Sequence, residues 1–145
     1  MHIPIGNKVE KMFSGIANKY DFLNHILSFG LDYYWRHRLA KKVQSLAPST
    51  LMDLATGSGD VAFKLSDTLN KTCSITATDF CHPMLDQAKI KQNKSEYYEN
   101  ISFEYADAMN LEFDDNTFDI VTIAFGVRNF ENREKGLREI LRVLK

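Results

Sequence analysis

The sequence predicts an α/β fold in which helices cover a parallel sheet. Two observations lead to this prediction. From residue 51 onward, short apolar or β-branched runs alternate with stretches of helical periodicity, the pattern of repeated β-α-β units. The run FDIVTIAF at 118–125 is almost continuously apolar, as expected of a strand that is buried on both faces. A length of 145 residues fits a single domain.

Two helices are expected before the sheet. Apolar side chains recur at helical spacing across residues 8–29, and Gly30 ends this stretch. The second helix is expected from Asp32, which can cap it, to about residue 47. Its buried side is expected to carry Trp35, Leu39, Val43 and Leu46. The single domain then divides into a helical cap or lid over 1–47 and a β/α core over 48–145.

The core is expected to contain four strands and three helices. The strands are predicted at 51–55, 74–79, 101–106 and 118–125. The helices are predicted from 60 to about 69, from Pro83 to about 94, and over 131–145. The last helix is expected to turn Leu137, Ile140, Leu141 and Leu144 inward.

Composition and charge exclude several classes of protein. Lys and Arg number 18 and Asp and Glu 19, a formal net charge of −1, so no nucleic-acid surface is predicted. Two cysteines are too few for a disulfide framework or a metal knuckle, and we expect reduced, partly buried thiols in a cytoplasmic protein with no metal site. Neither a leader nor an apolar run of 18 residues is present, so no signal peptide or membrane span is expected.

Residues 51–62, LMDLATGSGDVA, form the most informative motif. Gly57, Gly59 and Ala62 match G-x-G-x-x-[GA], the turn that brings a nucleotide-like cofactor onto a helix N-terminus. This turn follows a predicted strand and opens a predicted helix. The candidate cofactor-binding residues of the motif are Asp53, Thr56, Gly57, Ser58, Gly59 and Asp60.

Acidic residues follow three of the predicted strands. Ligands of parallel sheets bind at the carboxyl ends of the strands, so we expect Asp53, Asp60, Asp79 and Asp107 to surround one cleft mouth. Asp79 lies about 20 residues after Gly59, where an acid holds a ribose hydroxyl in dinucleotide folds. Because both NAD and S-adenosylmethionine contain ribose, Asp79 does not distinguish them.

The other acids favour S-adenosylmethionine. A pyrophosphate would be repelled by Asp53 and Asp60, whereas a sulfonium and an ammonium group would be attracted. Asp107 is placed to accept a hydrogen bond from an adenine amino group. We therefore interpret the chain as a Rossmann-like S-adenosylmethionine methyltransferase. A dinucleotide oxidoreductase and a cofactor-binding module without catalysis remain the alternatives.

Four stretches of the chain resemble the ubiquinone/menaquinone biosynthesis C-methyltransferases, a family that includes demethylmenaquinone methyltransferase. They are YDFLNHILSFGLDYYW (20–35), the glycine loop, DFCHPML (79–85) and the stretch from 113 to 145. Leu23 replaces a usual Met, and Asp32 replaces a usual His. The family continues after R-V-[LIVM]-K with P-G-G, whereas this sequence stops at Lys145. The resemblance therefore implies a chain that lacks the family's C-terminal strands, with an unprotected sheet edge at strand four or strand one.

The resemblance also implies site residues and a reaction. Cofactor contacts are implied at Ser58, Asp79, Asp107 and Ala108, and through the backbone at Ala124, where some members have Ser. The implied reaction is methylation of a ring carbon of a prenylated quinol, most simply demethylmenaquinol to menaquinol. The implied catalytic residues are Arg128, which would stabilise a phenolate, Asn129, which would orient the ring, and Tyr20. An ion pair of Arg128 with Glu131 or Asp119 is the alternative for that arginine.

The resemblance further implies partners. The substrate would be a small prenylated quinol. The apolar residues of the N-terminal helices, among them Phe13, Ile16, Phe22 and Leu27, would shield an isoprenoid tail or touch a membrane surface peripherally. Plain packing of these side chains onto the sheet is the alternative.

Overall fold

The computed structural model describes residues 5–16, 19, 31–95 and 97–145. Most of the first predicted helix beyond Ile16, together with Tyr20, Phe22 and Leu27, lies outside these residues. In chain order the elements are α1 (Ile5–Ile16), α3 (Leu31–Gln44), β1 (Thr50–Leu54), α4 (Asp60–Thr68), β2 (Ser74–Asp79), α5 (His82–Asn93), β3 (Ile101–Tyr105), β4 (Ile120–Ile123), the 3-10 helix η2 (Val127–Asn129) and α6 (Arg133–Val143).

The four described strands form one parallel sheet in the order β3-β2-β1-β4. Leu51 at the start of β1 is opposite Ile75 of β2 on one side and Ile120 of β4 on the other. This arrangement confirms the predicted α/β class. An edge was expected at strand four or strand one. Within the described sheet β4 forms an edge, whereas β1 lies inside the sheet. Because all three strand pairs are parallel, the carboxyl ends of the four strands lie at the same edge of the sheet.

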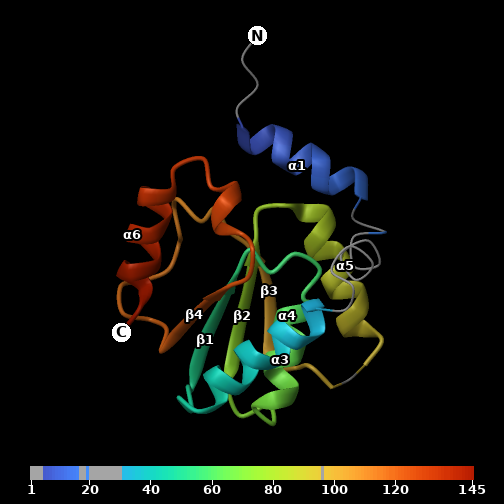
Figure 1. Ribbon diagram of the computed structural model, residues 1–145, viewed down its shortest axis with the longest axis vertical. Coiled ribbons are helices and arrows are strands. Elements are labelled where there is room, and N and C mark those ends of the chain that lie inside the picture. The colour runs from blue at the N-terminus through green and yellow to red at the C-terminus, as the bar shows by residue number, and fades with distance from the viewer. Residues whose placement is uncertain (1–4, 17–18, 20–30, 96) are drawn as a thin grey trace.

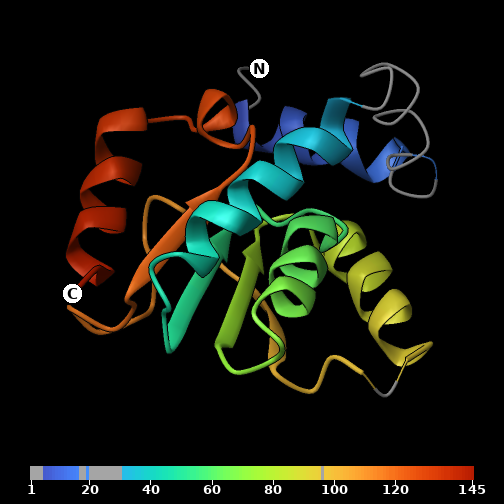
Figure 2. The same ribbon diagram turned by 60° about the horizontal axis from the view of Figure 1, so that its bottom comes forward.

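Helices cover both faces of the sheet (Figures 1 and 2). On one face, α3, α4 and α5 contribute residues such as Val43, Leu65 and Leu85 to a core that includes Leu51 and Ile75. On the other, α6 and the connection before β4 pack against the opposite sides of β1 and β4. Figure 1 shows α1 beyond the carboxyl ends of the strands. Strand alternation thus divides the apolar residues between two layers.

The element boundaries agree with the predictions best where local chemistry alone sets them. β2 coincides with the predicted strand over 74–79. β4 is shorter than predicted because Asp119 leaves the strand and its carboxylate accepts the backbone N–H groups of Ser49 and Thr50 at 3.0 and 2.9 Å. At the other end, Phe125 adopts a left-handed conformation with φ 63°. The last helix begins only after Asn132, whose side chain accepts the N–H of Lys135.

Four side chains expected to face inward are exposed, namely Trp35, Leu46, Leu137 and Leu141. In α3 the buried residues are Asp32, Ala40 and Val43, and Trp35 lies on a different side of the helix from them. In α6 the buried residues are Gly136 and Val143, which turns Leu137 and Leu141 outward. The prediction is right in part, because Leu39 and Val43 of α3 pack into one core and Ile140 of α6 packs against the other.

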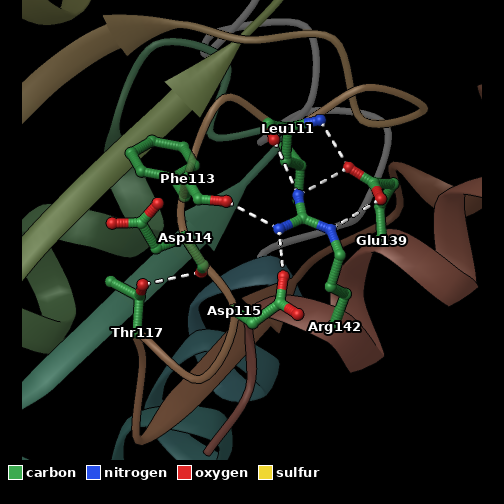
Figure 3. Close-up of polar contacts among 7 residues, drawn as sticks. All are labelled: Leu111, Phe113, Asp114, Asp115, Thr117, Glu139 and Arg142. Atoms are coloured by element: carbon green, nitrogen blue, oxygen red, sulfur yellow. Dashed lines mark hydrogen bonds and ion pairs between the residues drawn. The ribbon is translucent and has the colours of Figure 1, made fainter.

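Arg142 fastens the segment before β4 to α6 (Figure 3). Its guanidinium donates to the carbonyl oxygens of Leu111 and Phe113 at 2.7 Å each and pairs with Glu139 and Asp115. Glu139 also accepts the N–H of Leu111. The Arg142 guanidinium lowers the pKa of Glu139, and the two carboxylates raise the pKa of Arg142. This arginine of the RVLK stretch thus has a structural role here.

Both cysteines are free, as predicted, and both are almost fully buried rather than partly buried. Burial raises the pKa of the Cys73 thiol to about 11. Cys81 and Met84 form a small cluster against which Phe13 of α1 packs. This contact attaches α1 to the start of α5.

Candidate functional site

A cavity of about 320 Å³ lies at the carboxyl border of the sheet. The loop after β1 contributes Leu54, Ala55 and Gly57, and the end of β2 contributes Asp79 and Phe80. Further walls come from the residues after β3, from those after β4, and from η2. Glu10 and Phe13 of α1 complete the cavity. The cavity thus lies where the predicted strand ends meet, with a helix across it.

Asp79 joins the end of β2 to the glycine loop. Its side chain is 6% exposed, and its two oxygens accept the backbone N–H groups of Gly57 at 2.8 Å and Cys81 at 2.9 Å. Burial raises the pKa of this carboxyl, and the backbone N–H groups partly oppose that rise. Because Asp79 also lines the cavity, it can both fix the loop and accept hydrogen bonds from a ligand.

Asp53 is buried beneath the loop and does not line the cavity. The hydroxyls of Thr56 and Thr122 donate to its two oxygens at 2.7 and 2.6 Å. Burial raises its pKa to about 6, against the effect of the two hydroxyls and with a smaller contribution from the charge of Asp79. Asp53 therefore connects Thr56 of the glycine loop to Thr122 of β4.

Asp60, the first residue of α4, turns away from the cavity. Its carboxylate pairs with Arg36 of α3 at 3.0 Å and with Lys91 of α5 at 2.8 Å. Lys91 also donates to the Ser58 hydroxyl at 3.0 Å, and Arg36 pairs with Asp32 at 3.0 Å. These contacts connect three helices around the outside of the glycine loop.

Arg36→Ala is expected to lower the free energy of unfolding by about 1–3 kcal/mol, because two carboxylates that are less than a third exposed lose a cation. Urea denaturation measures this change. Arg138→Ala is the matched control, since Arg138 pairs with Glu134 on the surface and both side chains are about three-quarters exposed. The control should change stability by no more than about 0.5 kcal/mol. Equal losses in both variants would contradict the role given to Arg36.

The loops after β1 and β4 approach each other closely behind the cavity. A Cβ on Gly126 would lie 2.6 Å from the Cβ of Ala55, so only glycine fits between the two loops. Ala55 and Phe125 both have positive φ values, 57° and 63°, which non-glycine residues seldom adopt. Such strain is concentrated at functional sites, and both residues line this cavity.

The structure brings together seven of the predicted site residues. The cavity is lined by Gly57, Asp79, Asp107, Ala108, Ala124, Arg128 and Asn129. The cavity lining does not include Asp53, Thr56, Ser58, Gly59 or Asp60, and the expectation that Asp53 and Asp60 border the cleft mouth is corrected. Their carboxylates are used within the fold instead. Tyr20 lies outside the described residues.

Several lining residues were not predicted. The main ones are Glu10, Phe13, Phe80, His82, Met84, Tyr105, Phe130 and Glu131. His82 and Tyr105 stack with their ring centroids 4.7 Å apart. The rule that points to residues directly after each strand would have found Phe80, whereas Tyr105 is the last residue of β3 itself. No pattern in the sequence shows that α1 crosses the strand ends, which brings Glu10 and Phe13 to the site.

The described lining residues carry more negative than positive charge. The lining includes four carboxylates, those of Glu10, Asp79, Asp107 and Glu131, and one guanidinium, that of Arg128. Asp119, an alternative partner for Arg128, pairs with Lys145 at 3.0 Å. Among the described residues, no cluster of His, Cys, Asp and Glu is suited to a metal ion. The charge of the cavity suits a cationic ligand better than a pyrophosphate.

Solved structures identify the class to which this fold belongs. An S-adenosylmethionine-dependent methyltransferase from Aquifex aeolicus is 26% identical and superposes with a TM-score of 0.64 over 73% of this chain and 58% of its own. A putative methyltransferase from Methanococcus maripaludis, 22% identical, has the same fold, with a TM-score of 0.73 over 100% of this chain and 62% of its own. The fold is the Rossmann-like fold of S-adenosylmethionine-dependent methyltransferases.

The sequence then defines the family within that class. Residues 4–145 match the model of the ubiE/COQ5 methyltransferase family, and the chain belongs to this family. It is 42% identical over 140 residues to the ubiquinone/menaquinone biosynthesis C-methyltransferase UbiE of Geotalea daltonii, covering 97% of this chain and 60% of the relative. It is 43% identical over 138 residues to demethylmenaquinone methyltransferase of Bacteroides fragilis, covering 95% and 56%. The chain thus spans about 60% of the length of these relatives.

Proposed function

We propose that the protein binds S-adenosylmethionine and methylates a ring carbon of a prenylated quinol, with demethylmenaquinol as the simplest substrate. The observation that carries the choice of cofactor is the charge of the cavity, whose lining includes four carboxylates and one guanidinium. Family membership supports the choice of reaction. The alternative of a dinucleotide oxidoreductase has no such support, because this cavity would repel a pyrophosphate.

Five residues would form the cofactor site. Asp79 would accept the ribose hydroxyls, since it lines the cavity while its N–H contacts fix its position. The N–H of Met109 already occupies one oxygen of Asp107 at 2.9 Å, which fixes that carboxylate to receive the adenine amino group. Ala108 and the backbone of Ala124 border the same space. Gly57 lets the loop approach without a side chain.

The chemistry that the cofactor supplies is an electrophilic methyl group. The protein must assist loss of a ring hydroxyl proton so that electron density reaches the neighbouring carbon, must align that carbon with the methyl group, and must let the proton of that carbon leave after the methyl group is transferred from sulfur. Arg128 lines the cavity and would stabilise the phenolate. Asn129, on the same 3-10 helix, would orient the ring. Tyr20 stays a candidate by resemblance alone.

Titration calorimetry with S-adenosylmethionine and with NAD tests the cofactor directly. Binding of S-adenosylmethionine without binding of NAD is the expected result. A transfer assay with a labelled methyl group and a short-chain demethylmenaquinol in detergent then tests the reaction. Binding without methyl transfer would favour the third class, a cofactor-binding module, and binding of NAD alone would contradict the proposal.

Arg128→Ala is expected to lower turnover by at least about tenfold while the dissociation constant for S-adenosylmethionine stays within about twofold, because the phenolate loses its cation. Arg133→Ala is the control, since that arginine is also exposed and begins α6 outside the cavity. The assay compares kcat and cofactor affinity for both variants. Wild-type turnover in Arg128→Ala would remove Arg128 from the mechanism.

A further inference from the structure

One side of α3 is exposed and combines aromatic with basic side chains. Leu31, Tyr34 and Trp35 are 58%, 50% and 56% exposed, and Arg38, Lys41 and Lys42 are exposed as well. The spacing of these six residues places them on one side of the helix, opposite the buried line through Asp32, Ala40 and Val43. We call these six residues the α3 outer face.

Contacts within the α3 outer face hold its aromatic residues in place. The Arg38 guanidinium lies over the Tyr34 ring, 5.8 Å from its centroid, and donates to the Tyr34 hydroxyl at 3.0 Å. The rings of Tyr34 and Trp35 meet edge to face with centroids 5.5 Å apart. The apolar surface is therefore ordered although it stays exposed, which reduces the loss of side-chain entropy when a partner covers it.

The charge of this face differs from that of the chain. The whole sequence has a formal net charge of −1, yet the only acid in residues 31–47 is Asp32. Asp32 is buried and paired with Arg36, so it does not offset the three cations of the outer face. An anionic surface is the complementary partner. Tyr and Trp, with an apolar body and a polar edge, are the aromatic residues that favour the boundary between water and lipid.

We propose that the α3 outer face docks on a membrane surface that contains anionic lipids. The inference rests on the proposed function, because a prenylated quinol dissolves in a bilayer and must be reached there. Arg36, next to Trp35 in α3, pairs with Asp60 directly after the glycine loop, so the docked helix would lie beside the cofactor site. The described residues contain no helix able to span a membrane, and three apolar side chains provide only a shallow contact.

The single tryptophan of the chain lies on this face, and its fluorescence reports directly on docking. The full chain is mixed with phosphatidylcholine vesicles that contain or lack phosphatidylglycerol. We expect a blue shift of Trp35 emission, and quenching by brominated lipid, only with the anionic vesicles. Because each cation contributes about 1 kcal/mol at such a surface, binding should weaken steeply as salt is raised.

Two charge-reversal variants, which change the net charge by the same amount, test whether the docking surface is the α3 outer face. Arg38→Glu/Lys42→Glu should weaken vesicle binding at least about tenfold, and Arg133→Glu/Lys135→Glu on α6 should leave it within about twofold. Three results would overturn the proposal: an equal loss of vesicle binding in both variants, wild-type vesicle binding by Arg38→Glu/Lys42→Glu, or no vesicle binding by the unmodified chain. A tryptophan shift that depends on protein concentration without vesicles would overturn it too, since a second copy then covers the face.

Cofactor affinity and methyl transfer to a detergent-solubilised quinol separate this inference from the proposed function. Arg38→Glu/Lys42→Glu should keep both, because neither residue lines the cavity. Loss of S-adenosylmethionine binding in the unmodified chain contradicts the proposed function, whereas absence of vesicle binding contradicts only the docking of α3.

Discussion

Asp53→Asn is expected to stabilise the protein at pH 7–8, by up to about 3 kcal/mol. Burial raises the pKa of Asp53 from 3.8 to about 6, and a shift of about two units corresponds to about 3 kcal/mol between the two protonation states. Both partners of Asp53 are hydroxyls, those of Thr56 and Thr122. A hydroxyl can donate or accept, so an asparagine amide can bond to both without a buried charge.

The effect depends on pH with a defined sign. The folded state binds the proton of Asp53 more tightly than the unfolded state does. The stability that this group contributes is therefore complete below pH 3.8 and is lost as the pH rises through about 6. The amide that replaces this carboxyl in the variant would not titrate in this range. The stability difference between variant and wild type should hence be small near pH 4 and should grow in favour of the variant up to about pH 7.

Urea denaturation at several pH values between 4 and 8 measures this difference. Asp114→Asn is the control, because it removes the same charge at an exposed position. The control should differ in stability from the wild type by no more than about 0.5 kcal/mol, as is usual for an exposed position. The explanation fails if Asp53→Asn is no more stable than the wild type at pH 7–8, or if its difference from the wild type is constant across the range.

The fold could be predicted from the sequence where a segment's own residues set its structure. β2 was predicted over its observed range because SITATD combines β-branched residues with a clear end. β4 was predicted too long because its limits depend on distant partners. Asp119 leaves the strand to bind Ser49 and Thr50, which lie about 70 residues earlier in the chain. The position of β4 beside β1 is likewise set by packing between segments that no local pattern relates.

The candidate site was predicted in its position but only partly in its side chains. The rule of strand ends pointed to the edge of the sheet where the cavity lies, and Asp79 and Asp107 are among the residues that line it. It did not give the direction of the side chains, and the cavity lining includes neither Asp53 nor Asp60. Strand alternation contained a signal for Asp53, since Leu51 two residues earlier belongs to the core beneath α3 and α4. The partners of Asp60 come from two other helices, so its direction needed the tertiary structure.

Asp79→Asn is expected to have the opposite outcome to Asp53→Asn, although the chemical change is the same. The two oxygens of Asp79 accept backbone N–H groups, from Gly57 at 2.8 Å and from Cys81 at 2.9 Å. A backbone N–H can only donate. Whichever way the asparagine amide is turned, its NH₂ group faces one of these donors. One buried hydrogen bond is then lost, and the protein should be destabilised by about 1–3 kcal/mol.

The same change should weaken cofactor binding. The amide removes a carboxylate from the cavity, and the released N–H of Gly57 or Cys81 loosens the turn that would approach the ribose. We expect the dissociation constant for S-adenosylmethionine to rise at least about tenfold in calorimetry, which corresponds to about 1.4 kcal/mol. Asp53→Asn should bind with nearly unchanged affinity, because Asp53 does not line the cavity. Wild-type affinity in Asp79→Asn would show that the ribose is held elsewhere, since a carboxylate that fixes the loop and binds the ligand cannot be replaced without loss of both.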